Sequence, residues 1–377
     1  MVGKIKMKVI QVITLGSELY GAQRHVIDLC LSLQSEGHEV ILLLGNSGKM
    51  HEYARTLGIE THVLKHLKRS IHAFHDFVGV IELVQLLKKL EPDIVASHSS
   101  KAGILVRVAA WWLKIPNTFT VHGWSFAEGG PFFARKVYQL IEKAIGLISC
   151  KVILISEADK EYALQLGVLE KQKMELIHHG IKSPPYVIKP FNYKSDLPLT
   201  MVMAARFQAQ KDHETLVKAL SQLKNLNWRL FFLGDGELVP FIKERVQKLG
   251  LSDKIFFEGA VDNVPEYLQQ ADVFLLISNW EGLPISILEA MSYGLPVIAS
   301  DVAGVKEEVL DGVNGFVVPR KDAQSITSAI SALYYDRQMA LAMGEQSRER
   351  FEKYFTIDLM IKRTIQLYKD LAGKSDR

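Results

Sequence analysis

Residues 278–291 read SNWEGLPISILEAM, and this stretch decides the fold. The run before it, Val273–Ile277, is short, continuous and apolar, which is typical of a strand buried on both faces of a parallel sheet. Gly282 permits a tight turn, and Pro284 suits the first helical position, which needs no N–H donor. We therefore expect Glu281 in a strand-to-helix turn, at the carboxyl end of a parallel strand, where open α/β sheets bind ligands.

The helix that follows is expected to offer both a phosphate site and a second carboxylate. Backbone N–H groups in its first turn have no partner within the helix and lie at its positive end. Those of Leu283, Ile285 and Ser286 could therefore hold a phosphate. Helical periodicity places Glu289 opposite the apolar arc of the helix, which indicates either a solvated surface group or a group lining a cleft.

Outward from this stretch, strands alternate with amphipathic helices in both halves of the chain. This alternation predicts a doubly wound parallel sheet in each half, with right-handed crossovers. In the first half we expect strands at 8–14, 39–44, 61–64, 94–97, 118–121 and 151–155, and helices at 22–34, 79–90, 102–113 and 134–145. In the second half we expect strands at 199–204, 229–233, 255–257, 273–277, 296–299 and 315–318, and an almost wholly helical tail from Ala323 to Leu371.

The proline-rich stretch Ile181–Pro198 interrupts this alternation and reads as a linker. We therefore expect one Rossmann-like domain over residues 1–182 and a second over 197–355, with a ligand cleft between them.

Three segments of the first half end strands with residues suited to binding. Gly21, in the stretch Thr14–His25, would let an anion approach the backbone at a helix start, although a plain flexible loop fits the spacing equally well. His122 ends a strand and precedes a glycine. Its side chain therefore either points to the same rim of the sheet as Gly21 or is held structurally by hydrogen bonds to the backbone. His98 also ends a strand, and Lys101 could meet a phosphate at the next helix start. These two are the weaker candidates, which could serve only to shape the cleft.

In the second half, Arg206 and Lys211 follow the first strand. A guanidinium offers a bidentate fork and an ammonium a movable point charge, so the pair suits a diphosphate. The sequence contains no Asp-x-Asp and no cluster of His and carboxylates that would chelate a metal. We therefore expect no metal and no other cofactor.

Composition limits the remaining possibilities. The net charge is only +3, but most of the 12 histidines and an excess of Lys and Arg fall in the first half. That half is expected to meet an anionic partner, although ordinary scatter explains the excess equally well. Only Cys30 and Cys150 are present, and the longest apolar run, Ile104–Leu113, is interrupted by Arg107. We expect a cytoplasmic protein, either soluble or peripheral at the inner face of the membrane.

The motifs together resemble family-4 retaining glycosyltransferases of the GT-B fold, similar to those that build bacterial cell-surface polysaccharides. The resemblance rests on Glu281 and Glu289 with seven residues between them, on Arg206 and Lys211, and on the glycine-rich loop. It runs from Gly16 to about Gly315. In this loop Tyr20-Gly21 stands where the family shows two glycines, which puts only the role of the first glycine in doubt.

The resemblance implies a role for each of these positions. Glu281 would contact the donor sugar, Glu289 the ribose, and His122 the sugar near its reacting carbon. Arg206 and Lys211 would hold the donor diphosphate. Catalytic residues would then be His122, Glu281, Arg206 and Lys211. The expected donor-binding residues are Gly21, Arg206, Lys211, Val261, Glu281, Gly282, Leu283, Ile285 and Glu289, and the expected acceptor-side residues are Lys101 and His98.

The family also implies two facing Rossmann-like domains, with a C-terminal helix at about 356–377 crossing back to the first. The expected reaction moves a sugar from a UDP- or GDP-linked donor to a saccharide or lipid-linked saccharide, with retention and without a metal. The first domain would meet the acceptor and an anionic membrane; nucleic acid is not an expected partner. A nucleotide-sugar epimerase or hydrolase on the same fold, and a non-catalytic nucleotide-sugar-binding protein, remain alternatives.

Overall fold

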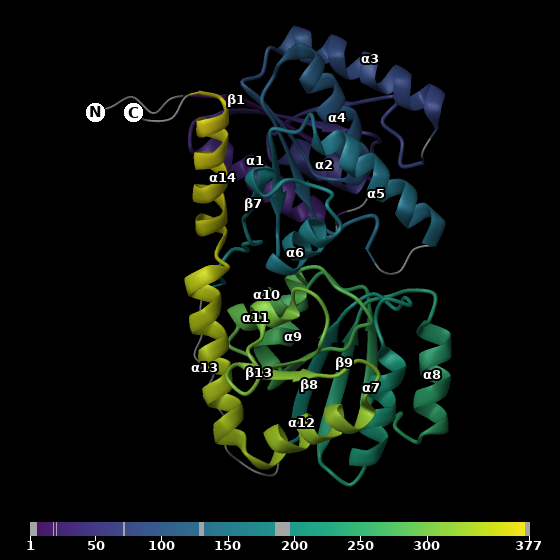
Figure 1. Cartoon of the computed structure of the whole chain (residues 1–377). Helices are drawn as coiled ribbons and strands as arrows, with labels where there is room; N and C mark the ends of the chain where they lie inside the picture. The colour runs from purple at the N-terminus through teal and green to yellow at the C-terminus, as the bar shows by residue number, and fades with distance from the viewer. Residues whose placement is uncertain are drawn as a thin grey trace, which may run out of the picture. The chain divides into compact units, whose positions relative to one another are not determined.

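A computed structural model describes residues 6–17, 19, 21–70, 72–127, 132–184 and 197–373. The chain divides into two compact units, and each is a layered α/β domain (Figure 1). Unit 1 comprises the described residues up to His179 together with those from Asp358 onward, and unit 2 runs from Gly180 to Ile357. The division therefore falls at Gly180, just before the stretch expected to be a linker, most of which (185–196) lies outside the described residues.

Unit 1 is built on a seven-stranded sheet in the order β3-β2-β1-β4-β5-β6-β7, and all its strand pairs are parallel. The chain reverses direction of travel across the sheet between β1 and β4, which is the switch point where ligands bind in such sheets. The strands are β1 (Lys8–Ile13), β2 (Glu39–Leu44), β3 (Glu60–Val63), β4 (Ile94–Ser97), β5 (Asn117–Val121), β6 (Lys151–Leu154) and β7 (Met174–Leu176).

Successive side chains of each strand point to opposite faces of this sheet, and helices pack against both sets of side chains. Ile10 and Val12 pack in one hydrophobic cluster with side chains of α3 and α4, whereas Gln11 between them meets Tyr368 of α14. The helices of unit 1 are α1 (Gly21–Ser35), α2 (Lys49–Thr56), α3 (Ala73–Leu90), α4 (Ser100–Leu113), α5 (Phe132–Gly146), α6 (Glu157–Gln165), the 3-10 turn η1 (Lys171–Lys173) and, from Asp358 on, α14 (Ile357–Leu371).

Unit 2 repeats the plan with six parallel strands in the order β10-β9-β8-β11-β12-β13. Its switch point lies between β8 and β11. The strands are β8 (Leu199–Ala204), β9 (Trp228–Leu233), β10 (Ile255–Gly259), β11 (Val273–Leu276), β12 (Val297–Ser300) and β13 (Gly315–Val318). The helices are α7 (His213–Leu220), η2 (Ser221–Leu223), α8 (Val239–Lys248), α9 (Val264–Gln270), α10 (Ile285–Ser292), α11 (Val305–Glu308), α12 (Ala323–Tyr335) and α13 (Arg337–Tyr354).

The predicted fold class is confirmed, and the predicted strands match the observed ones to within two residues at either end. The predicted helix at 79–90 was too short, because α3 already begins at Ala73. Gly79 was read as a helix start, but it lies inside α3, where a Cβ would come within 3.3 Å of the His66 carbonyl oxygen and of Leu105. The short elements α2, α6 and β7 were not predicted.

A buried ion pair explains the one charge in the longest apolar run. Arg107 of α4 is fully buried and meets both carboxylate oxygens of Glu142 on α5, at 2.9 and 2.7 Å. Its Nε donates to the Gly103 carbonyl at 2.7 Å, and its guanidinium lies 4.5 Å from the Phe119 ring centroid. Both charges are therefore fully bonded, as burial of an ion pair requires.

Candidate functional site

In unit 2, backbone pairing brings two of the predicted segments together at the carboxyl ends of β8 and β11. Lys211 and Ser278 form an antiparallel bridge, and the Asn279 N–H donates to the Gln210 carbonyl at 2.8 Å. The loop after β8 therefore lies directly against the turn after β11. This is why Lys211 and Glu281, which are far apart in sequence, become neighbours.

Lys211 and Glu281 form an ion pair. The two side chains are 13% and 6% exposed, so the pair is largely shielded from water. Gln210 strengthens it, because its amide donates to the second Glu281 oxygen at 3.2 Å and to the Trp280 carbonyl at 3.0 Å. The Lys211 ammonium is therefore held at this edge of the sheet by the Glu281 carboxylate, which is itself held in place by Gln210.

Helix α10 starts beside this pair. Pro284 is the N-cap residue and not the first helical residue as predicted, since its ψ of 109° is extended. The predicted apolar arc is correct, because Ile287, Leu288 and Met291 are buried, whereas Glu289 is half-buried. Pro284 makes no side-chain cap bond, and the Ile287 N–H donates to the Pro284 carbonyl at 2.9 Å. The N–H groups of Ile285 and Ser286 have no acceptor among the described residues, so these two are available to an anion.

The Glu281 turn is locked from behind by Gly304, which precedes α11. Gly304 has a φ of +78°, and a Cβ there would lie 1.7 Å from the Gly282 carbonyl oxygen. Only glycine fits a contact this close with a left-handed backbone.

Behind the turn lies a carboxyl group that the sequence analysis missed. Glu308, the last residue of α11, is fully buried, and neither of its carboxyl oxygens has a hydrogen-bond partner among the described residues. Burial raises its pKa well above the usual value, and the nearby Glu281 carboxylate raises it further. Arg350 and Lys211 act in the opposite direction. Glu308 is therefore expected to be protonated, and so it adds no second negative charge beside Glu281.

The other predicted donor residues of unit 2 lie around the same edge. Arg206 is exposed on the loop after β8, and Val261 is half-exposed in the loop after β10. Leu283 is buried in the turn.

In unit 1, four histidines converge at the corresponding edge of the sheet. His98 and His122 follow β4 and β5, His179 follows β7, and His25 lies on α1. His122 Nε2 is 3.4 Å from His98 Nδ1, and its Nδ1 is 3.1 Å from His179 Nε2. His179 Nδ1 is 3.1 Å from His25 Nδ1. Both ring nitrogens of His122, the predicted catalytic histidine, are thus taken up within the cluster.

Burial lowers the pKa of every imidazole in this four-histidine cluster. The pKa of His98 falls to about 3, and those of His25, His122 and His179 fall well below the usual value, because burial disfavours the cation and each neighbouring imidazole adds to this. The cluster is therefore neutral at physiological pH. Ligand atoms of His25, His98 and His122 lie within 4.8 Å of one another, which makes them the candidate ligand set for a metal ion.

Lys101, the predicted acceptor-side cation, is 9% exposed and forms an ion pair with Asp76 of α3. It lines a cavity of about 370 Å³ at the start of α4, together with Thr14, Arg69 and Ser99. Asp76 lines the same cavity and offsets the charge of Lys101, so Arg69 carries the net positive charge there. A cavity with this charge and several hydroxyls at a helix start suits an anionic ligand that carries further polar groups.

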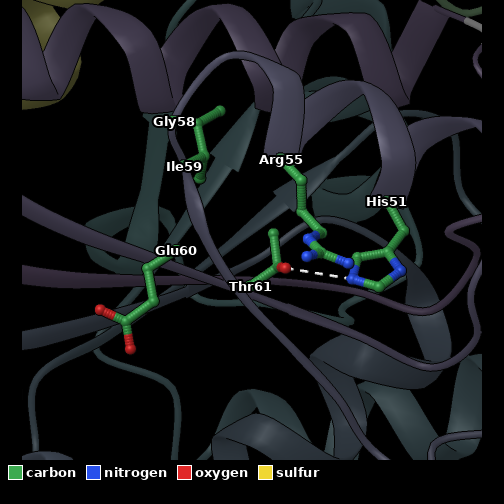
Figure 2. A pocket seen from close by; sticks show the side chains of 6 residues that line it. All are labelled: His51, Arg55, Gly58, Ile59, Glu60 and Thr61. Atoms are coloured by element: carbon green, nitrogen blue, oxygen red, sulfur yellow. Dashed lines mark hydrogen bonds between the residues drawn. The ribbon is translucent and has the colours of Figure 1, made fainter.

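A second hollow of unit 1 lies away from these residues. It is shallow and lies between α2 and β3, and Figure 2 shows His51, Arg55 and Thr61 on its wall, with His51 Nε2 3.1 Å from the Thr61 hydroxyl. None of the predicted site residues lines it.

Unit 1 also exposes apolar side chains on α4 and α5. Trp111 and Trp112 are exposed in the last turn of α4. Phe132, Phe133 and Leu140 are exposed along α5, and Leu147 is exposed just after it. Basic residues Arg135, Lys136 and Lys143 belong to the same helix. Within the described ranges, no helix is long and apolar enough to cross a membrane.

The structure thus gathers the predicted residues in two groups, one in each unit. Gly21, His98, Lys101 and His122 belong to unit 1, and Arg206, Lys211, Val261, Glu289 and the Glu281 turn belong to unit 2. The sequence analysis missed Gln210, Glu308, His25 and His179. His25 stands in the stretch Thr14–His25 and was given no role, whereas His179, which precedes Gly180, was interpreted only as a turn residue between the domains. Nothing in their local sequence shows that strands β1, β4, β5 and β7 bring them together.

Comparison with known proteins is consistent with the division of the chain into two units. A family profile described as "Glycosyltransferase Family 4" matches residues 20–183, and one described as "Glycosyl transferases group 1" matches residues 188–350. An Escherichia coli protein named UDP-Gal:alpha-D-GlcNAc-diphosphoundecaprenol alpha-1,3-galactosyltransferase is 28% identical, over 98% of both chains. A Campylobacter jejuni protein named N,N'-diacetylbacillosaminyl-diphospho-undecaprenol alpha-1,3-N-acetylgalactosaminyltransferase is 24% identical, over 94% of this chain and 96% of its own length.

Solved structures with the same fold include HepE from Anabaena in complex with UDP. It has a TM-score of 0.84 and 19% identity, and the match covers 97% of this chain and all of that one. A glycosyltransferase from Rickettsia africae has a TM-score of 0.83 and 22% identity, over 98% of this chain and all of that one.

Proposed function

The chain belongs to the glycosyltransferases that join a family-4 domain to a group-1 domain, and we propose that it transfers a sugar from a UDP-linked donor to a lipid-linked saccharide. We further propose that the anomeric configuration is retained and that no metal ion takes part. The observation that carries this proposal is the shielded Lys211–Glu281 pair beside the open first turn of α10.

The donor is assigned to unit 2 because this edge offers what a nucleotide-sugar requires. A diphosphate leaving group carries negative charge, which Lys211, Arg206 and the N–H groups at the start of α10 can stabilise as the bond to the sugar breaks. Glu281 and Glu289 carry carboxylates that accept hydrogen bonds from sugar and ribose hydroxyls. Protein cations and backbone dipoles supply the positive field that a metal ion supplies in other transferases.

The acceptor is assigned to unit 1. The Escherichia coli and Campylobacter jejuni relatives carry names that specify acceptors linked through a diphosphate to undecaprenol. In this chain the cavity at the start of α4 has Arg69 and the Lys101–Asp76 pair on its wall, which leaves one net positive charge for a diphosphate-linked saccharide. Acceptor attack on the face that the diphosphate leaves would give retention, and the leaving phosphate can take the acceptor proton.

A lipid-linked acceptor places the enzyme at a membrane surface, and α5 is the proposed contact. Its exposed apolar residues include Phe132 and Phe133, at 74% and 80%, and its basic residues suit anionic lipid. We expect the full chain to sediment with vesicles that contain anionic lipid and to be released by high salt. The double variant Phe132→Ser/Phe133→Ser should lose this binding, whereas Phe241→Ser on α8 of unit 2, which also removes an exposed Phe, should keep it. Equal binding by both variants would contradict a role for α5.

The proposed reaction is tested with the purified full chain. Thermal shift with UDP, GDP and their sugars identifies the donor, and product analysis with a polyprenyl-diphosphate-linked saccharide then measures transfer. We expect transfer that persists in EDTA and a product of retained configuration. Loss of transfer in EDTA would contradict metal independence. Turnover of the donor at the same rate without acceptor would instead identify a hydrolase or epimerase, and binding without turnover a non-catalytic protein.

A further inference from the structure

The four-histidine cluster of unit 1 is one continuous chain of hydrogen bonds that starts in the core. Gln11 of β1 donates from Nε2 to the hydroxyl of Tyr368, at 3.4 Å, and its carbonyl oxygen lies 2.6 Å from His98 Nε2. The chain continues from His98 to His122, then to His179 and finally to His25.

Proton counting fixes the direction of every bond in this chain. A neutral imidazole has one N–H and one lone pair. Because the Gln11 carbonyl only accepts, the N–H of His98 is on Nε2 and its Nδ1 carries the lone pair. His122 must then donate from Nε2 to His98 and accept at Nδ1. By the same rule His179 donates from Nε2, and it accepts at Nδ1.

The last member of the chain follows from this rule. His25 must donate from Nδ1 to His179, and so its Nε2 carries a lone pair. In the part of the chain that the structure describes, no hydrogen bond engages this nitrogen. This nitrogen is thus the open end of the chain, and it belongs to a largely buried side chain in the second turn of α1, the helix that follows β1.

The orientation of the Gln11 amide sets this direction. A Tyr hydroxyl can both donate and accept, so Tyr368 by itself permits either orientation. In the structure the amide N–H₂ is directed to Tyr368, and the carbonyl faces His98. This orientation of Gln11 fixes the tautomers, and the reverse orientation would place an N–H on His25 Nε2.

The same counting argues against the metal site that the distances alone suggest. As metal ligands, His122 through Nε2 and His25 through Nε2 would each carry an N–H on Nδ1. Both N–H groups would point at His179, at Nε2 and Nδ1. A neutral His179 has only one lone pair, so one of these contacts would set two N–H groups against each other.

We propose that His25 Nε2 is a hydrogen-bond acceptor for a hydroxyl group of a saccharide substrate, and that Gln11, His98, His122 and His179 are positioning residues that keep it so. A lone pair on a neutral ring attracts a hydroxyl proton and repels phosphate oxygens. The site therefore selects the sugar part of a substrate and not its diphosphate. This inference rests on the proposed function, and the hydroxyl belongs either to the donor sugar or to the acceptor.

The tautomers can be read directly, without any activity, in the full chain labelled with ¹⁵N-histidine. We expect long-range ¹H–¹⁵N correlation spectra at pH 7 to show His98, His122 and His179 protonated on Nε2 and His25 protonated on Nδ1. Single His→Gln variants assign the signals. Protonation of His25 on Nε2, or one equivalent of zinc retained by the purified protein, would overturn the proposal, whether or not the chain proves to be a transferase.

A matched pair of variants tests the role of the open end. His25→Gln places an amide near the position of Nε2 but removes the donor to His179, whereas His25→Asn keeps a donor near Nδ1 and removes the open end. We expect His25→Asn to lower kcat/KM roughly tenfold, about the value of one hydrogen bond, and His25→Gln to lose less. A larger loss in His25→Gln than in His25→Asn would show that His25 only holds the cluster together, and it would overturn the proposal.

Separate KM measurements identify the source of the hydroxyl. A rise in KM for the nucleotide-sugar alone places it on the donor, and a rise for the lipid-linked saccharide alone places it on the acceptor. Unchanged values of KM and kcat in His25→Asn would contradict a contact with either substrate.

Discussion

The four-histidine cluster of unit 1 and the Lys211–Glu281–Glu308 group of unit 2 occupy equivalent edges of two similar sheets, yet they handle charge in opposite ways. Burial removes the charge from the imidazoles, because their usual pKa lies close to neutrality. In unit 2 the charge of Lys211 is kept by pairing it with Glu281, and the nearby Glu308 is left to protonate.

This difference shows how one fold can prepare two kinds of surface. A neutral edge with oriented N–H groups and lone pairs suits hydroxyls, whereas an edge with a paired cation suits phosphates. Unit 1 does contain buried charges, but the Arg107–Glu142 pair lies between α4 and α5 and is fully bonded there. We therefore assign it to stability and not to binding.

The largest expected effect tests that assignment. Arg107→Met leaves Glu142 as a buried and unpaired carboxylate, which should cost about 3–5 kcal/mol of unfolding free energy. Urea unfolding of the full chain, with hydrogen exchange in peptides of α4 and α5, measures this loss. The double variant Arg107→Met/Glu142→Met should recover most of it.

A matched control uses an exposed pair of the same type in unit 2. Arg245 and Glu214 are 48% and 46% exposed, and Arg245→Met should cost at most about 1 kcal/mol. Equal losses for Arg107→Met and Arg245→Met would show that burial does not distinguish the two pairs.

The next effect concerns the charged edge of unit 2. Lys211→Met should lower kcat of transfer by about 10²–10³-fold, because a preorganised donor to the leaving group is lost. Lys248→Met removes an exposed lysine that pairs with Glu244 in the same unit, and it should leave the rate unchanged. If both variants retained the wild-type rate, the positive charge at this edge of unit 2 would have no role in sugar transfer.

The smallest effect concerns Glu308 and depends on pH. Its pKa in the folded chain is raised above the usual 4.5, so its contribution to stability is fully present below that value. It is lost as pH rises through the raised pKa, at about 1.4 kcal/mol per pH unit within that window. Glu308→Gln cannot ionise, so its stability relative to wild type should increase with pH.

Urea unfolding of wild type and Glu308→Gln at pH 5 and pH 8 measures this difference. A stability difference that is the same at both pH values would show that Glu308 is not protonated in the folded chain.

Much of the fold follows from local patterns. The apolar run before Glu281 and its counterparts each formed a parallel strand, because a strand buried on both faces must be apolar throughout. Helix starts were harder to predict. Gly79 was predicted to begin a helix, but it lies inside α3, where its lack of a side chain allows close packing against Leu105. For the site, strand-end position marked Lys211, Glu281 and His122, but it could not show which of them would touch.

The sequence by itself determined the alternation of strands and helices, and with it the edge of each sheet where ligands bind, because both depend on periodicity within a few turns or strands. Only the tertiary structure decided which side chains meet there. The pairing of Lys211 with Glu281, the burial of Glu308 and the order of His98, His122, His179 and His25 depend on strand order and crossover geometry. Those bring together residues that are separated by tens to hundreds of positions, and no local pattern records such distances.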